Sequence, residues 1–251
     1  MKVFVVNLEK DTEKKKLIEK QCKQLGFDFQ IIKAVNGNEL SKETLSAEVY
    51  EYGKEHLTKG EIGCALSHKI IYKKIADENL DFALILEDDA IINGKINNLL
   101  KKLKKIIDRN KNQVLLMQKS SQFFLNRKIK IDAEFEFYEA WNPKCTHGYM
   151  ITNKAAKTIL KINTPIIREA DHWLSFYQLS LLKVYCLNKN LITSRDEDKE
   201  ASNIEKERRM MTKEQIDYKN SLLDNKINYR LIKIYHKYIR RIFLKKHNGY
   251  L

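Results

Sequence analysis

The strongest constraint on the fold is a run of four apolar residues that ends abruptly in three acids. The residues from Ala83 to Leu86 are all apolar, and Glu87, Asp88 and Asp89 follow without a break. A short apolar run without polar alternation is typical of a strand covered on both faces, as in the sheet of an α/β protein. Such sheets bind ligands beyond the carboxyl ends of their strands, so we expect the acids at a ligand-binding edge.

The segments around this run alternate between strand and helix patterns. Val3 to Val6 predicts a first strand, and Asp11 or Thr12 can cap a helix that ends near Leu25. Further strands are expected at 27–32, 114–117, 149–151 and 184–187, and further helices from 58 to 72, 96–107, 153–160 and 171–177. Strict alternation from Lys128 to Tyr138 predicts a half-buried strand or hairpin, an antiparallel addition. The pattern predicts one α/β domain with a mostly parallel, mixed sheet over residues 1–205, followed by a helical tail over 206–251.

Size and composition favour a folded protein with an anionic partner. The chain has 251 residues, 43% of them hydrophobic, and a formal net charge of +14. This excess of Lys and Arg suits nucleic acid, an acidic membrane face or a phosphorylated substrate. The four cysteines stand far apart without a CxxC pair, which argues against a zinc site and favours free thiols. The apolar run at the start is too short for a signal peptide, and no stretch approaches the length of a membrane span, so a cytoplasmic protein is expected.

The three acids after the central strand predict a cation site. Carboxylates crowded together repel one another unless a cation compensates, and Mg²⁺ or Mn²⁺ takes oxygen ligands and bridges to phosphates. Glu87 and Asp89 would point the same way if the strand geometry persisted beyond Leu86. The alternative is that Asp88 or Asp89 only caps the following turn.

A second candidate lies at the start of the helix that precedes this strand. Thr58 and Glu61 have the spacing of a capping box, with Gly60 and Gly63 on either side of the glutamate. Glycines let a ligand approach the backbone, and helix N-termini favour anions; tight packing would explain the glycines equally well. His68 follows Glu61 by seven residues, on nearly the same face, where a structural histidine is the plainer interpretation.

Several motifs together resemble glycosyltransferase family 25, which contains bacterial lipooligosaccharide galactosyltransferases and collagen hydroxylysine galactosyltransferases. The matching segments are VFVVNLEKDTEKK, IIKAVNG, LTKGEIGCALSHKIIYKKI, ALILEDDA and GYMITNKAAKTIL. The segment around Asp171 also matches, although its Asp-His-Trp sequence leaves the role of His172 open. The ordered pair GEIGCALSH and LEDDA carries most of the resemblance. It implies a GT-A-like fold and an inverting transfer, often of galactose from UDP-galactose.

The resemblance also implies roles for individual residues. Donor contacts are implied for Asn7, Leu8, Ala34, Asn36, Gly37, Gly60, Gly63, Ser67, His68, Glu87 and Asp88. The metal ion, Mn²⁺ or Mg²⁺, is implied at Asp88 and Asp89. Asp171 matches an acidic position late in the domain and is the predicted catalytic base, with Glu61 and Glu169 as alternatives. The implied partners are a UDP-sugar and a glycan or glycolipid acceptor, without nucleic acid.

The last part of the chain is basic. The segment from 195 to 209 is dense in charge and is predicted as a loop, and no acid occurs from Lys226 onward. The basic residues are Lys226, Arg230, Lys233, Lys237, Arg240, Arg241, Lys245 and Lys246, and the apolar residues at helical spacing are Ile227, Leu231, Ile234, Tyr238 and Ile242. Such a helix can lie on an anionic membrane, here the inner face of a bacterial inner membrane, or its apolar stripe can pack on the domain.

A metal-dependent nuclease or another nucleic-acid-binding protein is the main alternative. It would also combine carboxylates with a basic surface. It fits less well, because no lysine closely follows the acids and no aromatic-basic motif for nucleic acid is present.

Overall fold

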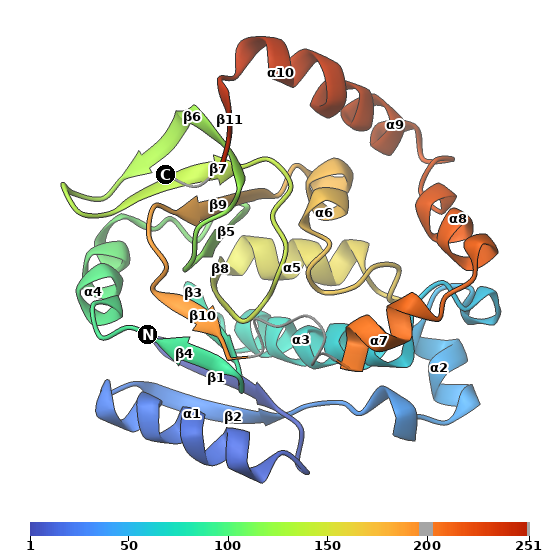
Figure 1. Cartoon of the computed structure of the whole chain (residues 1–251), viewed down its shortest axis with the longest axis horizontal. Coiled ribbons are helices and arrows are strands. Elements are labelled where there is room, and N and C mark those ends of the chain that lie inside the picture. The colour runs from blue at the N-terminus through green and yellow to red at the C-terminus, as the bar shows by residue number, and fades with distance from the viewer. Residues whose placement is uncertain (196–202, 250–251) are drawn as a thin grey trace.

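A computed structural model of the chain describes residues 1–195 and 203–249. Within these residues a nine-stranded sheet has the order β11-β6-β7-β9-β5-β8-β3-β1-β2, and β10 pairs with β4 in a separate ribbon (Figure 1). The strands are β1 (Lys2–Asn7), β2 (Asp28–Lys33), β3 (Phe82–Glu87), β4 (Ala90–Ile92), β5 (Gln113–Leu116), β6 (Gln122–Lys130), β7 (Glu136–Ala140), β8 (Gly148–Thr152), β9 (Lys183–Leu187), β10 (Ile192–Ser194) and β11 (Lys246–Asn248). The α/β class and the mixed sheet predicted from the sequence are confirmed.

Helices cover both faces of this sheet. The larger ones in the first 180 residues are α1 (Thr12–Gln24), α2 (Lys42–Glu48), α3 (Lys59–Asp77), α4 (Ile96–Ile106), α5 (Asn153–Ile162) and α6 (Trp173–Ser180). One core cluster joins α1 and α4 to the even-numbered residues Leu84 and Leu86 of β3. The other joins α3, α5 and α6 to the odd-numbered Ala83 and Ile85. The fully apolar run is therefore buried on both faces, as its pattern predicted.

Strand register brings two parts of the candidate site together. β1 lies parallel to both β2 and β3, with Val6 opposite Glu87, so Asn7 and Asp88 follow at the same edge. On its other side β3 pairs antiparallel with β8, with Ile85 opposite Tyr149. The predicted alternating segment forms a hairpin of β6 and β7, which joins the sheet through β9.

The C-terminal segment returns to the sheet. It contains α7 (Asn203–Arg209), α8 (Lys213–Ser221), α9 (Ile227–Ile234), the π-helix η3 (Tyr235–Ile239), α10 (Arg240–Phe243) and β11. Residues 203–209 of the predicted loop are therefore helical, whereas residues 196–202 lie outside the described residues. β11 pairs with β6 at the edge of the main sheet, a strand that the sequence did not predict. Figure 1 shows α7 across α3 and the later helices arching back to the sheet.

Candidate functional site

The carboxyl ends of β1 and β3 hold the first part of the site. Asn7 is 3% exposed, and its side-chain amide donates to Asp88 Oδ2 at 2.7 Å and to the carbonyl of Asp11 at 3.2 Å. Burial, with Asp89 nearby, raises the pKa of Asp88 to about 6, although the hydrogen bond from Asn7 acts in the opposite direction. Ionised Asp88 is thus a costly state, which a bound cation would stabilise.

Asp89 lies beside Asp88 but contacts another segment. The Ser194 hydroxyl, at the end of β10, donates to Asp89 Oδ2, and the Arg195 amide donates to the Asp89 carbonyl at 2.9 Å. The antiparallel pairing of Ser194 with Ala90 sets this contact. The two neighbouring carboxylates offer the hard oxygen ligands that Mg²⁺ or Mn²⁺ takes, so the residues present fit such an ion.

The acidic triplet divides between the two faces of the sheet. β3 ends at Glu87, and Asp88 and Asp89 form a turn. The strand geometry that would have pointed Glu87 and Asp89 the same way therefore stops at Glu87. Glu87 points to the same face of the sheet as Ile85, toward α3. Its Oε1 lies 3.5 Å from His68 Nε2. Burial alone would raise the pKa of Glu87, but His68, Thr146 and His147 together lower it.

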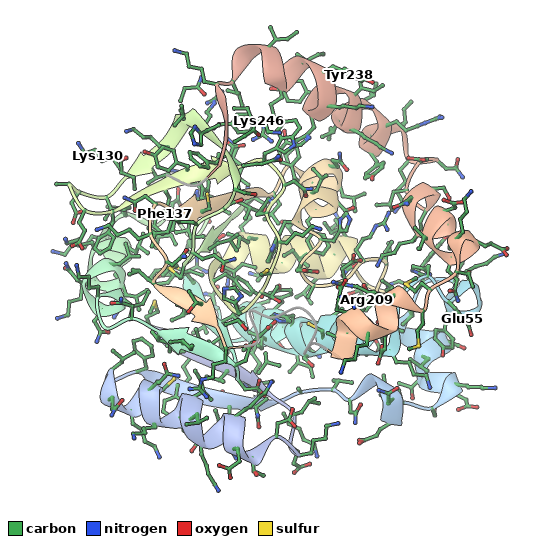
Figure 2. The ribbon with its side chains drawn as sticks, in the orientation of Figure 1. Glu55, Lys130, Phe137, Arg209, Tyr238 and Lys246 are labelled. Carbon is green, nitrogen blue, oxygen red and sulfur yellow. The ribbon has the colours of Figure 1, made fainter. Side chains whose placement is uncertain are left out.

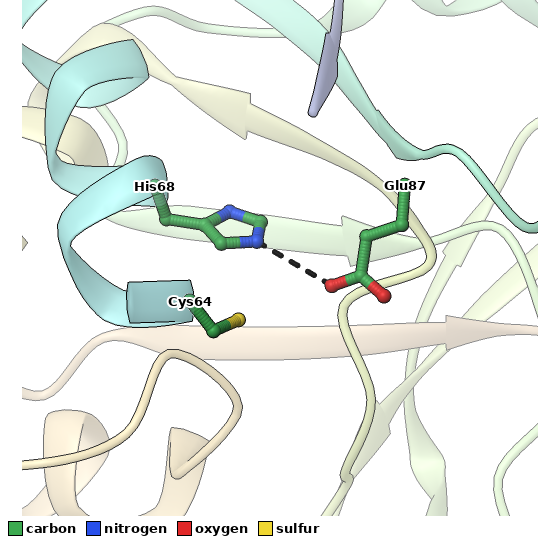
Figure 3. Close-up of side chains that lie close together, drawn as sticks. All are labelled: Cys64, His68 and Glu87. Atoms are coloured by element: carbon green, nitrogen blue, oxygen red, sulfur yellow. Dashed lines mark ion pairs between the residues drawn. The ribbon is translucent and has the colours of Figure 1, made fainter. Parts of the chain in front are cut away.

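His68 lies inside the protein under this edge. It is completely buried, and its Nδ1 is 2.7 Å from the Tyr149 hydroxyl, which is itself 2.7 Å from the Tyr72 hydroxyl. The two rings of His68 and Tyr149 stack with centroids 5.7 Å apart. Cys64 lies one turn earlier on α3 and faces the same space (Figure 3).

The turn after β2 packs tightly on α3. The Ala34 amide donates to the Asn7 carbonyl at 2.8 Å, and the Val35 amide donates to Ser67 Oγ at 2.8 Å. A Cβ on Gly37 would lie 1.8 Å from the Lys59 carbonyl oxygen, and one on Gly63 would lie 2.5 Å from that of Val35. Packing alone therefore requires glycine at both positions, and no contact with a sugar donor is needed to explain them.

The remaining predicted contacts of this turn are local. The Asn36 side chain caps a short 3-10 helix, Gly37–Glu39, by accepting from the Asn38 amide at 3.2 Å. The Leu8 carbonyl accepts from the Asp11 amide at 2.8 Å. These residues shape the loops that follow β1 and β2.

Glu61 occupies the start of α3 with both oxygens engaged. The predicted capping box is present: Glu61 Oε2 accepts from the Thr58 amide at 2.9 Å, and Thr58 Oγ1 accepts from the Glu61 amide at 3.1 Å. Its Oε1 accepts from Arg208 Nε at 2.7 Å and from Lys219 Nζ at 3.0 Å. Glu61 is only 1% exposed, so α7 and α8 supply the cations that make its burial tolerable.

Two more acids share these cations. Lys219 Nζ lies 3.1 Å from Glu169, and Arg208 lies 3.7 Å from Asp171. Burial opposes ionisation of Glu169, but Lys219 and His172 lower its pKa. Burial and Glu169 raise the pKa of Asp171 against the opposing effect of Arg208. His172 has a structural contact: its Nδ1 accepts from the Ser175 amide at 3.3 Å and caps α6.

Gly60 is covered by α7. The Glu207 carboxylate accepts from the Gly60 amide at 2.9 Å, where an anionic ligand of this helix N-terminus would bind. Arg208, Lys219 and Glu207 are the residues that sequence reasoning missed. They lie in segments read as a loop and a tail, and no spacing in the sequence links them to residues about 150 positions earlier.

The structure thus forms two acidic groups. The edge pair is Asp88 and Asp89, and the neutralised group is Glu61, Glu169 and Asp171 with Arg208 and Lys219. Glu87 and His68 lie on the α3 side of β3, beneath the sheet edge.

The C-terminal helices bury one face and expose another. Tyr229, His236 and Arg240 are buried; Arg240 pairs with Glu139, and the His236 ring stacks on Trp141 with centroids 3.9 Å apart. The outer apolar face, defined here as Ile227, Leu231, Ile234, Tyr238 and Ile242, is between 52% and 78% exposed. Figure 2 shows Tyr238 on this outer arc, with Lys246 on the strand that returns to the sheet.

Comparison with known proteins gives a family match over most of the chain. The family model described as Glycosyltransferase family 25 (LPS biosynthesis protein) matches residues 1–174. Procollagen galactosyltransferase 2 of Mus musculus is 30% identical over 115 residues, which cover 43% of this chain and 18% of that protein. A glycosyltransferase 25 family member of Aedes aegypti is 34% identical over 95 residues, 35% of this chain and 16% of that protein.

Solved structures that resemble this chain include one of a further glycosyltransferase. It is the crystal structure of a glycosyltransferase involved in the glycosylation of the major capsid of PBCV-1, 17% identical, covering 64% of this chain and 63% of that chain with a TM-score of 0.33. So low a score adds nothing to the fold assignment. The family match, by contrast, gives no support to the nuclease alternative.

Proposed function

This chain belongs to glycosyltransferase family 25, and from that premise we propose that it is an inverting, metal-dependent, GT-A-like glycosyltransferase. Its proposed reaction moves galactose from UDP-galactose to a lipooligosaccharide or related glycan, with a β-linkage. The observation that supports this proposal best is the edge pair of Asp88 and Asp89 at the carboxyl ends of parallel strands. This is where α/β sheets bind nucleotides.

In this proposal each acid has one task. Asp88 and Asp89 would hold Mn²⁺ or Mg²⁺, which neutralises charge on the departing UDP when bound. Asn7 orients Asp88 through its 2.7 Å hydrogen bond. Asp171 accepts the proton of the acceptor hydroxyl, and burial with Glu169 nearby raises its pKa, which makes its carboxylate a stronger base. Glu61 and Glu169 are weaker candidates for the base, because Lys219 already pairs with both.

Donor binding tests this function directly. UDP with Mn²⁺ should raise the melting temperature, because a ligand at 100 times its Kd stabilises the folded state by about 2.7 kcal/mol. A screen of nucleotide-sugars for metal-dependent hydrolysis should then select UDP-galactose. Stabilisation by single-stranded DNA or RNA, without a response to UDP and Mn²⁺, would contradict the proposal.

We further propose that the outer apolar face rests on an anionic lipid surface at the inner face of a bacterial inner membrane, where a lipid-linked acceptor would lie. Exposed basic residues surround this face, including Lys226, Arg230 and Lys237. Basic residues near an anionic membrane contribute about 1 kcal/mol each, and apolar side chains add their own burial. None of the helices in residues 1–195 and 203–249 is long and apolar enough to cross a bilayer.

Substitution tests this contact better than truncation. Removing residues 226–251 would also remove β11 and the buried Tyr229 and Arg240. The pair Leu231→Asn and Ile234→Asn should lower co-sedimentation with phosphatidylserine vesicles at least about tenfold, since each apolar side chain contributes about 1.5 kcal/mol or more.

The melting temperature of this double variant should stay unchanged, because both residues are more than half exposed. The matched control is Leu17→Asn with Ile106→Asn, two similarly exposed side chains on α1 and α4. Vesicle binding that persists in the Leu231 and Ile234 double variant would exclude this face as the contact.

A further inference from the structure

Three potential metal ligands converge on the α3 side of the central strand. Cys64 and His68 lie one turn apart on α3, and Glu87 ends β3 (Figure 3). One ligand atom from each residue lies within 4.8 Å of the others, the one such group found among the described residues. No sequence pattern predicts this site, because the cysteines lack metal-binding spacing.

His68 is oriented as a metal ligand would be. Its Nδ1 is held by the Tyr149 hydroxyl at 2.7 Å, which leaves Nε2 toward Glu87 and Cys64. Nε2 is buried without a hydrogen-bond partner, and Glu87 Oε1, at 3.5 Å, is too distant for a good hydrogen bond. Metal-bound histidines commonly have their second nitrogen fixed in this way.

The distances between these ligand atoms are also close to those around a tetrahedrally coordinated Zn²⁺ ion. Ligand atoms at about 2.0–2.3 Å from Zn²⁺ lie roughly 3.3–3.8 Å from one another. The 3.5 Å between His68 Nε2 and Glu87 Oε1 falls in this range. Cys64 Sγ lies within 4.8 Å of both other ligand atoms. It would have to approach them by at most about 1.5 Å to complete three protein ligands.

We propose that Cys64, His68 and Glu87 bind one Zn²⁺-class transition metal ion, separate from the hard-cation position at Asp88 and Asp89. A thiolate and an imidazole favour Zn²⁺ over Mg²⁺ or Mn²⁺, whereas a pair of carboxylates has the opposite preference. Glu87 lies beside His68 on the α3 side of β3, whereas Asp88 lies in the turn after the strand and accepts a hydrogen bond from Asn7, so the two carboxylates serve different sites. Binding releases the Cys64 thiol proton to solvent and leaves a fourth position for water. This inference stands independently of the proposed donor and acceptor.

Cobalt substitution tests the site without an activity assay. Co²⁺ added to the full chain should give a thiolate-to-cobalt charge-transfer absorption that saturates at one equivalent, and Zn²⁺ should abolish it. Cys64→Ser and His68→Gln should remove the absorption. Tyr149→Phe should keep it but weaken Zn²⁺ affinity about 10–100-fold, as loss of an outer hydrogen bond does.

Two controls locate the ion. Cys145→Ser, at an exposed cysteine elsewhere, and Asp89→Asn should both retain the absorption. If Cys64→Ser does not fold, X-ray absorption of the wild-type protein with one equivalent of Zn²⁺ should show one sulfur ligand at about 2.3 Å. No charge-transfer absorption in the wild type, its persistence in Cys64→Ser, or a zinc spectrum without exactly one sulfur ligand overturns the proposal.

Discussion

The edge pair and the neutralised group carry the same kind of charge in opposite electrostatic surroundings. Asp88 has a neutral amide as its hydrogen-bond partner, and burial raises its pKa to about 6. Glu169 is buried too, but Lys219 at 3.1 Å and nearby His172 lower its pKa. Burial alone therefore does not decide which carboxylate ionises readily; the cation beside it does.

This difference separates two uses of carboxylates in one protein. The neutralised group has protein cations fixed by α7 and α8, and these ion pairs hold both helices against α3. The edge pair is better suited to a cation from solution. Asp171 lies between the two cases, because burial and Glu169 raise its pKa while Arg208 lowers it.

The largest expected effect comes from Asp171. Asp171→Asn preserves shape but cannot accept a proton, so kcat should fall about 10²–10⁴-fold, as for loss of a general base. UDP affinity, measured by titration calorimetry, should stay near wild type. A base must be deprotonated, so the wild-type rate rises as pH passes upward through the pKa of Asp171. Since Glu169 raises that pKa, Glu169→Gln should move this limb to lower pH.

The outcome of these substitutions also identifies the base. A loss in Asp171→Asn smaller than about tenfold is below the usual contribution of a general base and would shift the role to Glu169 or Glu61. A matched control is Asp28→Asn, because Asp28 is an exposed acid on β2 whose side chain is 70% accessible. Its kinetics should equal those of the wild type.

Substitution in the edge pair should impair metal binding rather than acceptor binding. Asp89→Asn should lower turnover on the order of 10²–10³-fold, comparable to the loss of one strong electrostatic contact in a transition state. It should also abolish stabilisation by Mn²⁺ and UDP in a thermal melt. Without metal the variant should be at least as stable as wild type, because Asp89 raises the pKa of Asp88 and its removal relieves repulsion. Normal turnover in the presence of EDTA would rule out the metal role.

The sequence predicts the edge pair better than the neutralised group, for a physical reason. An apolar strand that ends in acids is a local pattern, and strand polarity places such ends at a ligand-binding edge. The capping box of Thr58 and Glu61 is equally local. Arg208 and Lys219 reach Glu61 only through the path of the chain after residue 203, and that path is set by packing. The orientation of the outer apolar face and the pairing of β11 with β6 depend on the same path of the chain.

Breaking the neutralised group should cost stability more than activity. Lys219→Met leaves Glu169 and Glu61 short of a cation, and we expect a loss of about 3 kcal/mol, the low end for a broken buried pair because Arg208 remains on Glu61. Glu169 has a lowered pKa in the folded state, so its contribution is present above the unfolded value of 4.5 and is lost as pH falls through the folded value. The difference between variant and wild type, from urea unfolding, should therefore shrink in acid.

The control for this loss lies on the same helix. Lys213 is exposed at the start of α8, so Lys213→Met should change stability by less than about 0.5 kcal/mol, as at other surface positions. A loss in Lys219→Met that is independent of pH between 7 and 3 would show that packing of the lysine stem, rather than its charge, holds the group together.

The smallest expected effect concerns the carboxylate of Glu207, which α7 places on the Gly60 amide at 2.9 Å. A negative charge at a helix N-terminus contributes about 0.3–1 kcal/mol, so Glu207→Gln should lower stability by that amount. If the donor diphosphate binds near the same end of α3, the lost carboxylate no longer competes with it. UDP affinity should then rise by about twofold to fivefold, the same free energy expressed as a ratio. Asp217→Asn, at an exposed acid in the middle of α8, is the matched control and should change neither quantity. Weaker UDP binding in Glu207→Gln would mean that α7 supports the donor site rather than occupying part of it.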